Sequence, residues 1–574
     1  MSETNWNKRN LLVVVALFGL AGLIVVGSPQ NQAPQAPSGP IPGGRGERWG
    51  TYGNDPQRSG FQRFDRFFTH ESGENFQLIW KMQFSKDPQV AITQPVVTEP
   101  VITVRGFRDI AVVADSKDNV YGIDIDLGKF IWTKYLDVPA PTLNGADAKC
   151  PGGLTANVTF SPPLVFGRGR GFAFFGANAN PARSGAGRGQ LGDGGVPAPA
   201  NGAAQGGGAR GRGAFGTGGR GFGGNQSAFV VASDGTLHSL AITDGYETNP
   251  SLSFLPKPNG DVSSLNLSND VMYAETGNSC GGLPDAVWAV DMSGDAHAIT
   301  SFEPQSTGAW GKGGVSIGTD GTVYTQTGDG EFDPVNGEYG NALVALTAKD
   351  LQVKDFFSFA SGDDFSAKSD EFSVTPTVFQ LDGKDLVATA GPDGRVDLLD
   401  SKDLGGSDHK TALFQSSPLV EDLQNPQHGI AGGLSTWEDA NNTRWVLVPV
   451  WGPVSKDVRF PGENGDITHG AIAAFKIEQQ SGKLVLDPAW ISRDMVAPMP
   501  AAIIHGVVFA LSGGEPHGPN AVLYALDSQT GKELHSSGSS IDSWSREGLT
   551  AANGYVYVTT KTGILYCFGV YQEH

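Results

Sequence analysis

The chain has 574 residues, 80 of them glycine, and only 17% of its residues are charged. A formal net charge of −20 disfavours binding of the body of the protein to nucleic acid or to an anionic membrane surface. The three cysteines, Cys150, Cys280 and Cys567, form no CxxC or CxxCH motif, so a thiolate zinc site and a covalent c-type haem both lack their ligands.

Residues 1–27 are predicted to be a signal peptide or an N-terminal membrane anchor. The stretch from Leu11 to Gly27 is almost wholly apolar and follows Lys8 and Arg9. Positive charge on this flank predicts a periplasmic or extracellular location for the rest of the chain, with residues 11–27 as an inner-membrane tether if they are not cleaved. Residues 28–45, rich in Pro, Gln and Gly, are expected to form an extended linker.

Residues 46–574 are predicted to form one propeller. An apolar strand that ends in a small, mostly acidic turn recurs eight times, mostly at spacings of roughly 40–55 residues, which suits four short strands and their turns. The equivalent apolar residues of the eight segments are Ile123, Leu240, Val290, Leu346, Leu399, Phe475, Leu526 and Phe568. The pattern therefore predicts an all-β, eight-bladed β-propeller with four-stranded blades.

One blade is expected from four segments near the N-terminus of the propeller. They cover residues 96–104, 109–116, 119–126 and 129–136. The last blade, by contrast, has chain for only about three strands at typical strand lengths. Residues 76–82 (FQLIWKM), which include Trp80, are expected to supply its fourth strand, because ring closure leaves no unpaired sheet edge.

Residues 167–224 interrupt the second blade and are dominated by Gly, Ala and Arg. This stretch contains seven arginines and a single acidic residue, Asp193. We interpret it as a disordered inserted loop. An RNA-binding segment of the Arg/Gly type is the alternative, but a location outside the cytoplasm favours a solvated loop with no nucleic-acid partner.

Several segments resemble the repeats of pyrroloquinoline-quinone (PQQ) type propellers. They are ALDSQTGKEL from Ala525 and GIDIDLGKFIW ending at Trp132, and WGTYGNDPQRSGFQ, starting at Trp49, resembles the opening segment of many members. In such repeats a Trp on the outer strand packs on the next blade and its N–H reaches that blade's turn. The Asp and Thr cap the turn, and the Gly takes a positive φ. The resemblance therefore implies residues that hold blades together.

Other segments resemble the quinoprotein dehydrogenases of this group, and this resemblance implies PQQ and Ca²⁺ as cofactors. The TGN turn at YAETGNSCGG would give Asn278 to the calcium ion, with Asp329 in the parallel position one blade later. Asp370 falls nearest to the catalytic base that takes the alcohol proton. Arg395 is the cation nearest to the place where these enzymes present Lys or Arg.

The sequence departs from the dehydrogenase pattern at several places: the Trp-Asp pair around the base and the Glu that would complete the calcium site are both missing. It also has no pair of adjacent cysteines, and Pro392 stands where the Lys or Arg is expected. We therefore expect a binding or scaffold module that uses a propeller face for a protein or small-molecule partner. A PQQ- and calcium-dependent alcohol or sugar dehydrogenase is the alternative.

Cys150 and Cys280 both lie in Gly-rich turns of early blades. Outside the cytoplasm they could pair, and such a disulfide between neighbouring blades would be structural. Cys567 lies in the last apolar segment and is expected to be a buried thiol.

Overall fold

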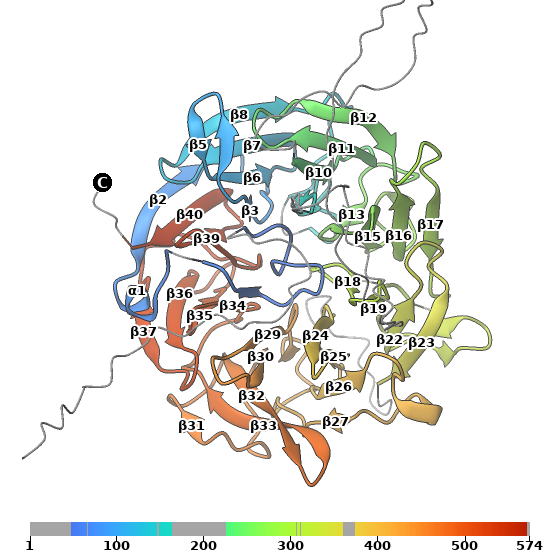
Figure 1. Cartoon of the computed structure of the whole chain (residues 1–574), viewed down its shortest axis with the longest axis vertical. Helices are drawn as coiled ribbons and strands as arrows, with labels where there is room; N and C mark the ends of the chain where they lie inside the picture. Colours follow the sequence, from blue (N-terminus) through green and yellow to red (C-terminus); the bar gives the residue numbers. More distant parts are fainter. Residues whose placement is uncertain are drawn as a thin grey trace, which may run out of the picture.

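The computed structural model describes residues 48–65, 67–145, 148–162, 226–305, 307–309, 311–359 and 373–570. Eight antiparallel sheets stand as blades around a central axis (Figure 1). Within these residues the single α-helix is α1 (His70–Glu74), and no helix is long and apolar enough to cross a membrane. The expected all-β, eight-bladed propeller is confirmed. The predictions for residues 1–27, 28–45 and 167–224 concern segments outside the described residues.

The blades are numbered along the chain, with their strands given from the axis outward. Blade 1 has β3 (Val96–Val97), β6 (Ile110–Ala114), β7 (Asn119–Asp124) and β8 (Lys129–Tyr135). Blade 2 has β9 (Thr159–Phe160), β10 (Ser227–Val231), β11 (Thr236–Ala241) and β12 (Glu247–Ser253). Blade 3 has β13 (Asp261–Val262) with β14 (Asn266–Ser268), then β15 (Val271–Gly277), β16 (Ala286–Asp291) and β17 (Ile299–Phe302). Blade 4 has β18 (Ser316–Ile317), β19 (Val323–Gln326), β22 (Ala342–Leu346) and β23 (Val353–Ser358).

The second half of the ring follows the same plan. Blade 5 has β24 (Thr377–Leu381), β25 (Lys384–Ala390), β26 (Val396–Asp400) and β27 (Phe414–Gln415). Blade 6 has β28 (Gly429–Ile430) with β29 (Ser435–Glu438), then β30 (Arg444–Trp451), β32 (Gly470–Gln480), β33 (Lys483–Ile491) and the extra β31 (Gly462–Glu463). Blade 7 has β34 (Ala502–Ile504), with β1 (Phe61–Gln62) paired parallel to it at the axis, then β35 (Val507–Ser512), β36 (Val522–Asp527) and β37 (Glu533–Ser536). Blade 8 has β38 (Thr550–Ala552), β39 (Tyr555–Thr559), β40 (Ile564–Gly569) and β2 (Gln77–Gln83).

The eight repeated segments of the sequence are the third strands of the eight blades. Each equivalent apolar residue, from Ile123 in β7 to Phe568 in β40, lies in such a strand and is buried. The hydrophobic clusters lie between neighbouring blades; one, for example, joins Val112 of blade 1 to Val230 of blade 2. The second and third strands of each sheet therefore bury both faces against neighbouring blades, which explains why these strands are the most apolar.

Antiparallel strand order gives the ring two different faces. Connections from first to second strand and from third to fourth strand lie on one face, which we call the hairpin face. Connections from second to third strand and from blade to blade lie on the other, which we call the cavity face.

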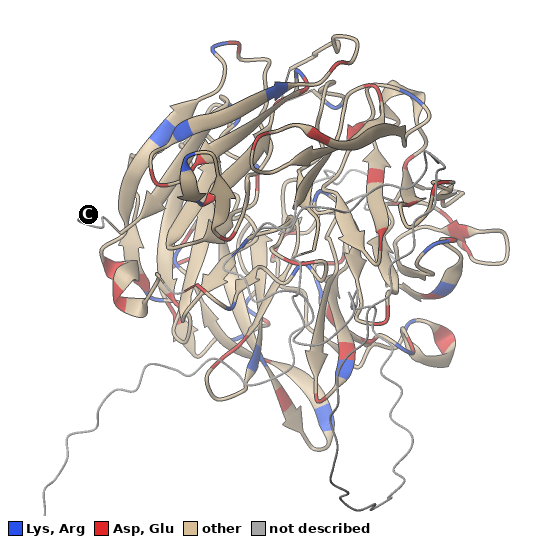
Figure 2. Cartoon of the chain, turned by 45° about the horizontal axis from the view of Figure 1, so that its top comes forward, with Lys and Arg blue, Asp and Glu red and all other residues tan. Residues whose placement is uncertain are grey.

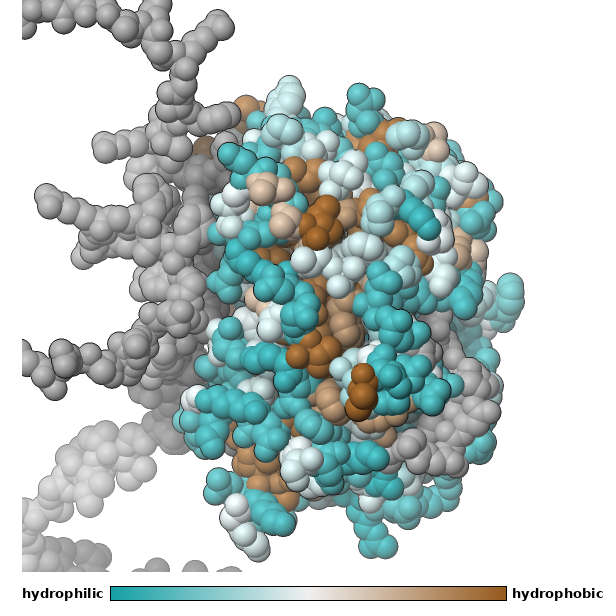
Figure 3. Space-filling view, turned by 90° about the vertical axis from the view of Figure 1, so that its right-hand side faces the viewer, coloured by the Kyte–Doolittle hydropathy of each residue, from teal (hydrophilic) through white to brown (hydrophobic). Residues whose placement is uncertain are grey.

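Charged residues of both signs are scattered over the molecule (Figure 2). On the side formed by blades 3 and 4, hydrophilic residues predominate and apolar residues form only a narrow band (Figure 3).

The predicted ring closure is confirmed. Strand β2 pairs antiparallel with β40, with Trp80 opposite Cys567, so the N-terminal strand is the outermost strand of blade 8 (Figure 1). This pairing closes the ring of blades, and Cys567 is a buried free thiol.

Tryptophans fasten several neighbouring blades in the way the repeats imply. The indole N–H of Trp490, from blade 6, donates to the Ser528 carbonyl of blade 7 at 2.9 Å. Its ring covers Gly531, where an added Cβ would lie 2.3 Å from the ring. Gly531 has a φ of +68°, and the Asp527 carboxylate caps the same turn by accepting the Thr530 N–H at 2.8 Å. The fastening is therefore a matched set of Trp, Asp, Thr and Gly.

Two further pairs of blades are fastened in the same way. Trp80 of blade 8 donates to Ile125 of blade 1 at 2.7 Å, and Trp132 of blade 1 donates to Ile242 of blade 2 at 2.7 Å.

The segment from Trp49 to Gly60, which we call the axial segment, contacts one blade after another around the axis. Its backbone is hydrogen-bonded to Val97 of blade 1 and Phe160 of blade 2, and the Thr51 hydroxyl donates to Leu265 of blade 3. Backbone bonds then follow to blades 4, 5, 6 and 7, namely Pro56 O to Ile317 N, Gln57 O to Val378 N, Ser59 O to Thr436 N and Gly60 O to Ile503 N. The axial segment therefore ties the inner ends of seven blades together.

Residues 96–104 were expected to be one strand, and this expectation is wrong. They form the short β3 and then β4 (Val101–Thr103), which pairs with β5 (Gly106–Arg108) in a separate hairpin on the hairpin face. Pro100 separates the two strands, because proline lacks the N–H that a continuous ladder would use.

Candidate ligand-binding cavity

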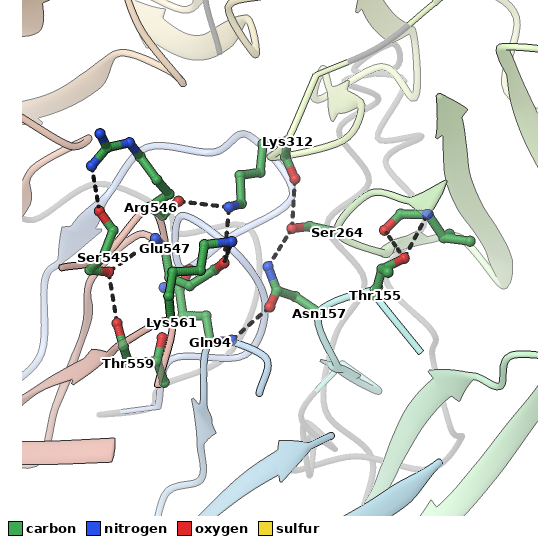
Figure 4. Close-up of polar contacts among 11 residues, drawn as sticks. Gln94, Thr155, Asn157, Ser264, Lys312, Ser545, Arg546, Glu547, Thr559 and Lys561 are labelled. Atoms are coloured by element: carbon green, nitrogen blue, oxygen red, sulfur yellow. Dashed lines mark hydrogen bonds and ion pairs between the residues drawn. The ribbon is translucent and has the colours of Figure 1, made fainter. Parts of the chain in front are cut away.

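A cavity of about 640 Å³ lies on the cavity face and is enclosed by connections of blades 1, 2, 3, 7 and 8 (Figure 4). Its size is in the range of small-molecule sites, and its wall combines apolar and polar groups. Each wall segment is a loop positioned by the rigid inner strands of a blade. The fold thus brings together residues that lie more than 450 positions apart in the sequence.

Two lysines meet one glutamate at this cavity. Lys312, from the connection between blades 3 and 4, donates to Glu547 Oε1 at 2.9 Å and to the Arg546 carbonyl at 2.7 Å. Lys561, from the β39–β40 turn, lies 3.5 Å from the same carboxylate oxygen. Burial would raise the pKa of the Glu547 carboxyl, but the two ammonium groups outweigh it and hold that pKa below its ordinary value. Glu547 is therefore ionised and balances one of the two lysine charges.

Trp544 and Arg546 form a second, aromatic part of the wall. The Arg546 guanidinium lies 5.1 Å from the Trp544 ring centroid and 4.9 Å from that of Trp451. Lys561 Nζ lies 5.9 Å from the Trp544 ring. Arg546 Nη1 also donates to the Gly514 carbonyl at 2.8 Å, which fixes the guanidinium in place. The cavity therefore offers a flat ring next to cations, the arrangement of a cation–π contact.

Hydrogen bonds across blades hold the opposite wall. Asn157 accepts from the Gln94 backbone N–H at 2.7 Å, and its amide donates to Ser264 Oγ at 2.7 Å. Ser264 Oγ in turn donates to the Lys312 carbonyl at 2.9 Å (Figure 4). This chain links blades 1 to 4 and leaves the lysine ammonium pointing toward Glu547. The cation is thus positioned before any ligand arrives.

A disulfide joins two segments of the wall. Cys150 and Cys280 are bonded, so the pairing considered from the sequence is present. It connects the loop between blades 1 and 2 to the β15–β16 connection of blade 3. Lys149 and Asn278, which stand beside the two half-cystines, line the cavity.

The residues singled out by the resemblance to dehydrogenases are not gathered in one place. Asn278 lines the cavity, and its amide donates to Asp261 Oδ2 at 3.0 Å. Asp329 accepts from the Asn341 amide at 2.9 Å, and Arg395 donates to the Ser416 carbonyl at 2.8 Å. Neither is among the described residues that line the cavity. Asp370 lies outside the described residues, and the roles given to all four stay predictions.

Sequence reasoning missed the cationic and aromatic residues of the cavity. Lys312, Trp544, Arg546 and Lys561 are single residues in irregular connections, and no motif surrounds them. The only available signal was topological. In a propeller, residues just before a first strand and between second and third strands lie on one face, so their charges can be compared once the blades are aligned.

A buried glutamate lies just outside the cavity, between blades 3 and 4. Glu275 accepts the Thr325 hydroxyl at 2.7 Å and the Gly311 N–H at 2.8 Å. Burial raises its pKa to about 7, although these hydrogen bonds and the charge of Arg58 oppose the shift. The folded state therefore holds a proton here that the unfolded chain, with an ordinary glutamate, releases near pH 4.5.

This proton predicts a pH dependence of stability. The contribution of protonated Glu275 is fully present below about pH 4.5 and is lost as the pH rises through about 7. Between pH 5 and pH 8 the native protein should lose up to about 3 kcal/mol more stability than a Glu275→Gln variant. Asp397, with a pKa raised by burial to about 8, acts in the same direction in both proteins. Denaturant unfolding of both proteins at each pH measures the difference, and parallel pH profiles would contradict it.

Similarity to known proteins is found in the structure and not in the sequence. No protein-family model matches the sequence, and no curated protein matches it significantly. The structure is similar to the quinohemoprotein alcohol dehydrogenase of Comamonas testosteroni, with 12% identity, a TM-score of 0.51, and coverage of 92% of this chain and 81% of that chain. It is also similar to a europium-containing methanol dehydrogenase, with 10% identity, a TM-score of 0.52, and coverage of 91% and 98%.

A third similar structure is the quinohemoprotein alcohol dehydrogenase ADHIIG of Pseudomonas putida. It shares 11% identity, with a TM-score of 0.51 and coverage of 91% of this chain and 80% of that chain. At identities this low, the structural similarity shows a common fold and nothing more. The chain therefore has the PQQ-like eight-bladed β-propeller fold that these dehydrogenases share.

Proposed function

We propose that this chain is a ligand-binding propeller outside the cytoplasm and that its cavity binds a small anionic ligand. The observation that carries the proposal is the charge of the cavity wall. Its cations are Lys149, Lys312, Arg546 and Lys561, and its carboxylates are Asp261 and Glu547. This local excess of positive charge stands in a chain whose net charge is −20. A cavity of such a charge concentrates anions.

The wall also selects for shape. A flat ring can stack on Trp544 while carboxylates on its edge receive charge-assisted hydrogen bonds from Lys312 and Lys561. PQQ, an aromatic tricarboxylate, has this chemistry, and it is the first probe to use. When bound, PQQ supplies a quinone that accepts electrons; the described residues would hold and orient it.

Two further observations support a location outside the cytoplasm. The disulfide between Cys150 and Cys280 is of a kind that persists in oxidising compartments. Lys8 and Arg9 before the apolar stretch are the signal of a segment whose following chain is exported.

Titration of the purified chain with PQQ tests the proposal. We expect saturable quenching of tryptophan fluorescence, because Trp544 lies in the wall. A Lys561→Met variant keeps Lys312 beside Glu547 and should bind PQQ about 10- to 100-fold more weakly, the effect of losing one charged hydrogen bond. Lys456→Met is the matched control, since its side chain is 87% exposed and lies away from the cavity. Equal affinity of all three proteins, or no binding, would overturn the proposal.

A quinone-dependent dehydrogenase is the second candidate, favoured by the position of Asn278 and Asp261 in the cavity wall. Ca²⁺ takes six to eight oxygen ligands. Across the described ranges no group of three His, Cys, Asp or Glu side chains could hold a metal ion, and the Asn278 amide points its N–H at Asp261. The described residues thus do not by themselves make a calcium site. Dye reduction by primary alcohols with PQQ and Ca²⁺ added would establish this activity, and its absence while PQQ still binds would leave the binding function alone.

A further inference from the structure

Exposed apolar side chains gather at one end of blades 8 and 1. Twelve large hydrophobic residues are exposed in the part of the chain that the structure describes. Five of them belong to connections on the hairpin face of these two blades, and we call them the apolar rim: Phe67, Ile102, Val104, Phe107 and Leu127. Val104, at the tip of the β4–β5 hairpin, is 98% exposed, and Phe107 is 70% exposed. Such a concentration marks an interaction surface.

The members of the apolar rim are held next to one another by short contacts. At the base of the hairpin, Arg108 Nε lies 3.0 Å from Asp124 Oδ2, which brings the hairpin against the turn that carries Leu127. On the other side, Asn553 donates to the Thr98 carbonyl at 2.9 Å. The next residue, Gly554, donates to Asp65 Oδ2 at 2.7 Å and packs against Phe67. The two blade ends are therefore one continuous surface.

The hairpin itself has one buried and one exposed face. Ile102 and Phe107 are register partners and both are exposed, whereas Val101 packs on the core between blades 1 and 2. Thr103 is buried and its hydroxyl accepts the Arg105 N–H at 3.0 Å, which stiffens the tip. Figure 1 shows β5 toward the outer edge of the ring, at blade 1. Ile102 and Phe107 thus lie on the exposed side of the hairpin, whereas Val101 and Thr103 lie on its buried side.

We propose that the apolar rim inserts into the surface of a lipid bilayer. Projecting aromatic and aliphatic side chains flanked by the exposed Arg105 and Lys129 suit the bilayer interface, where basic side chains reach the headgroups. The route of the chain fits this occupant. Arg48 Nη1 donates to Ser161, just after β9, so the chain enters the described structure on the hairpin face. Only 20 residues, 28–47, separate Arg48 from the apolar stretch that ends at Gly27, a span of at most about 70 Å.

The apolar rim lies on the face opposite the cavity, so contact of the rim with a bilayer does not depend on a ligand in the cavity. Because the net charge of −20 disfavours anionic lipids, the expected surface is zwitterionic, and the contact is driven by burial of apolar area.

The test places an environment-sensitive nitrobenzoxadiazole label on either face. Val104→Cys labels the apolar rim. Val335→Cys is the matched control, since Val335 is 94% exposed but lies between β19 and β22 on the cavity face. Wild-type protein, whose Cys567 is buried, controls for background labelling. The full chain carrying each label is reconstituted in phosphatidylcholine vesicles with and without a lipid-borne quencher.

At position 104 we expect a blue-shifted, brighter emission that the lipid quencher suppresses, and at position 335 an aqueous emission that it leaves unchanged. Equal behaviour of the two labels would overturn the proposal. So would a blue shift at position 104 that grows with protein concentration without lipid, because the rim would then join two copies of the chain. PQQ titration of the same samples reports the cavity separately, so failure of one proposal is distinguishable from failure of the other.

Discussion

An Arg58→Met variant is expected to lose about 3–5 kcal/mol of folding stability. Arg58 is 2% exposed at the centre of the ring. Its guanidinium donates to the carbonyls of Tyr52 at 2.8 Å, Leu265 at 3.1 Å and Val315 at 3.2 Å, so it joins the axial segment to the inner ends of blades 3 and 4. Methionine fills similar space but leaves the buried carbonyls without this donor. Each unsatisfied buried carbonyl lowers the free energy of unfolding by about 1–3 kcal/mol.

Denaturant unfolding measures this effect, with two controls. Arg58→Lys keeps the charge but has no planar fork of donors, so it should recover only part of the loss. Arg105→Met changes an exposed arginine and should leave the midpoint of unfolding unchanged within about 0.5 kcal/mol. If Arg58→Met unfolded at the same denaturant concentration as Arg105→Met, the Arg58 guanidinium would not be what joins the axial segment to blades 3 and 4.

A Trp490→Ala variant should lose a similar amount, about 3–5 kcal/mol, because it empties a fully buried site between blades 6 and 7 and removes the hydrogen bond to Ser528. Gly531→Ala disrupts the same contact from blade 7, since the added Cβ would lie 2.3 Å from the Trp490 ring. Gly538→Ala is the matched control. Gly538 also has a positive φ, +54°, but nothing lies within 4 Å of a Cβ there, so only the backbone cost of about 1 kcal/mol remains.

The midpoint of thermal unfolding, followed by tryptophan emission, ranks these variants. Gly531→Ala should fall well below Gly538→Ala. If the two glycine variants unfolded together, the indole of Trp490 would not be a tight fastening between blades.

The architecture could be predicted from the sequence because it repeats. Eight short segments carry the same pattern, so one weak signal is seen eight times, and each marks a third strand. Ring closure by the strand around Trp80 followed from the strand count of the last blade. The β4–β5 hairpin was missed because residues 96–104 (VVTEPVITV) are mostly apolar or β-branched, and only Glu99 and Pro100 indicate a break.

The candidate site was much less predictable. Asn278 does line the cavity, but the other wall residues come from loops that share neither period nor motif, and their approach depends on the ring geometry. The role of the axial segment was also not visible, since its contacts are mostly backbone hydrogen bonds that carry no residue pattern. The resemblance pointed to individual residues such as Asn278, whereas the positive charge of the cavity wall is visible only once the loops are arranged in space.

The central claim is that the cavity beside Lys312, Trp544 and Lys561 binds a small flat anion. A crystal structure of the full chain with PQQ tests it most directly. We expect density for the quinone in this cavity, with its ring against Trp544 and carboxylates within hydrogen-bonding distance of the lysine ammonium groups. An unoccupied cavity at saturating PQQ, or PQQ bound elsewhere on the propeller, would contradict the claim.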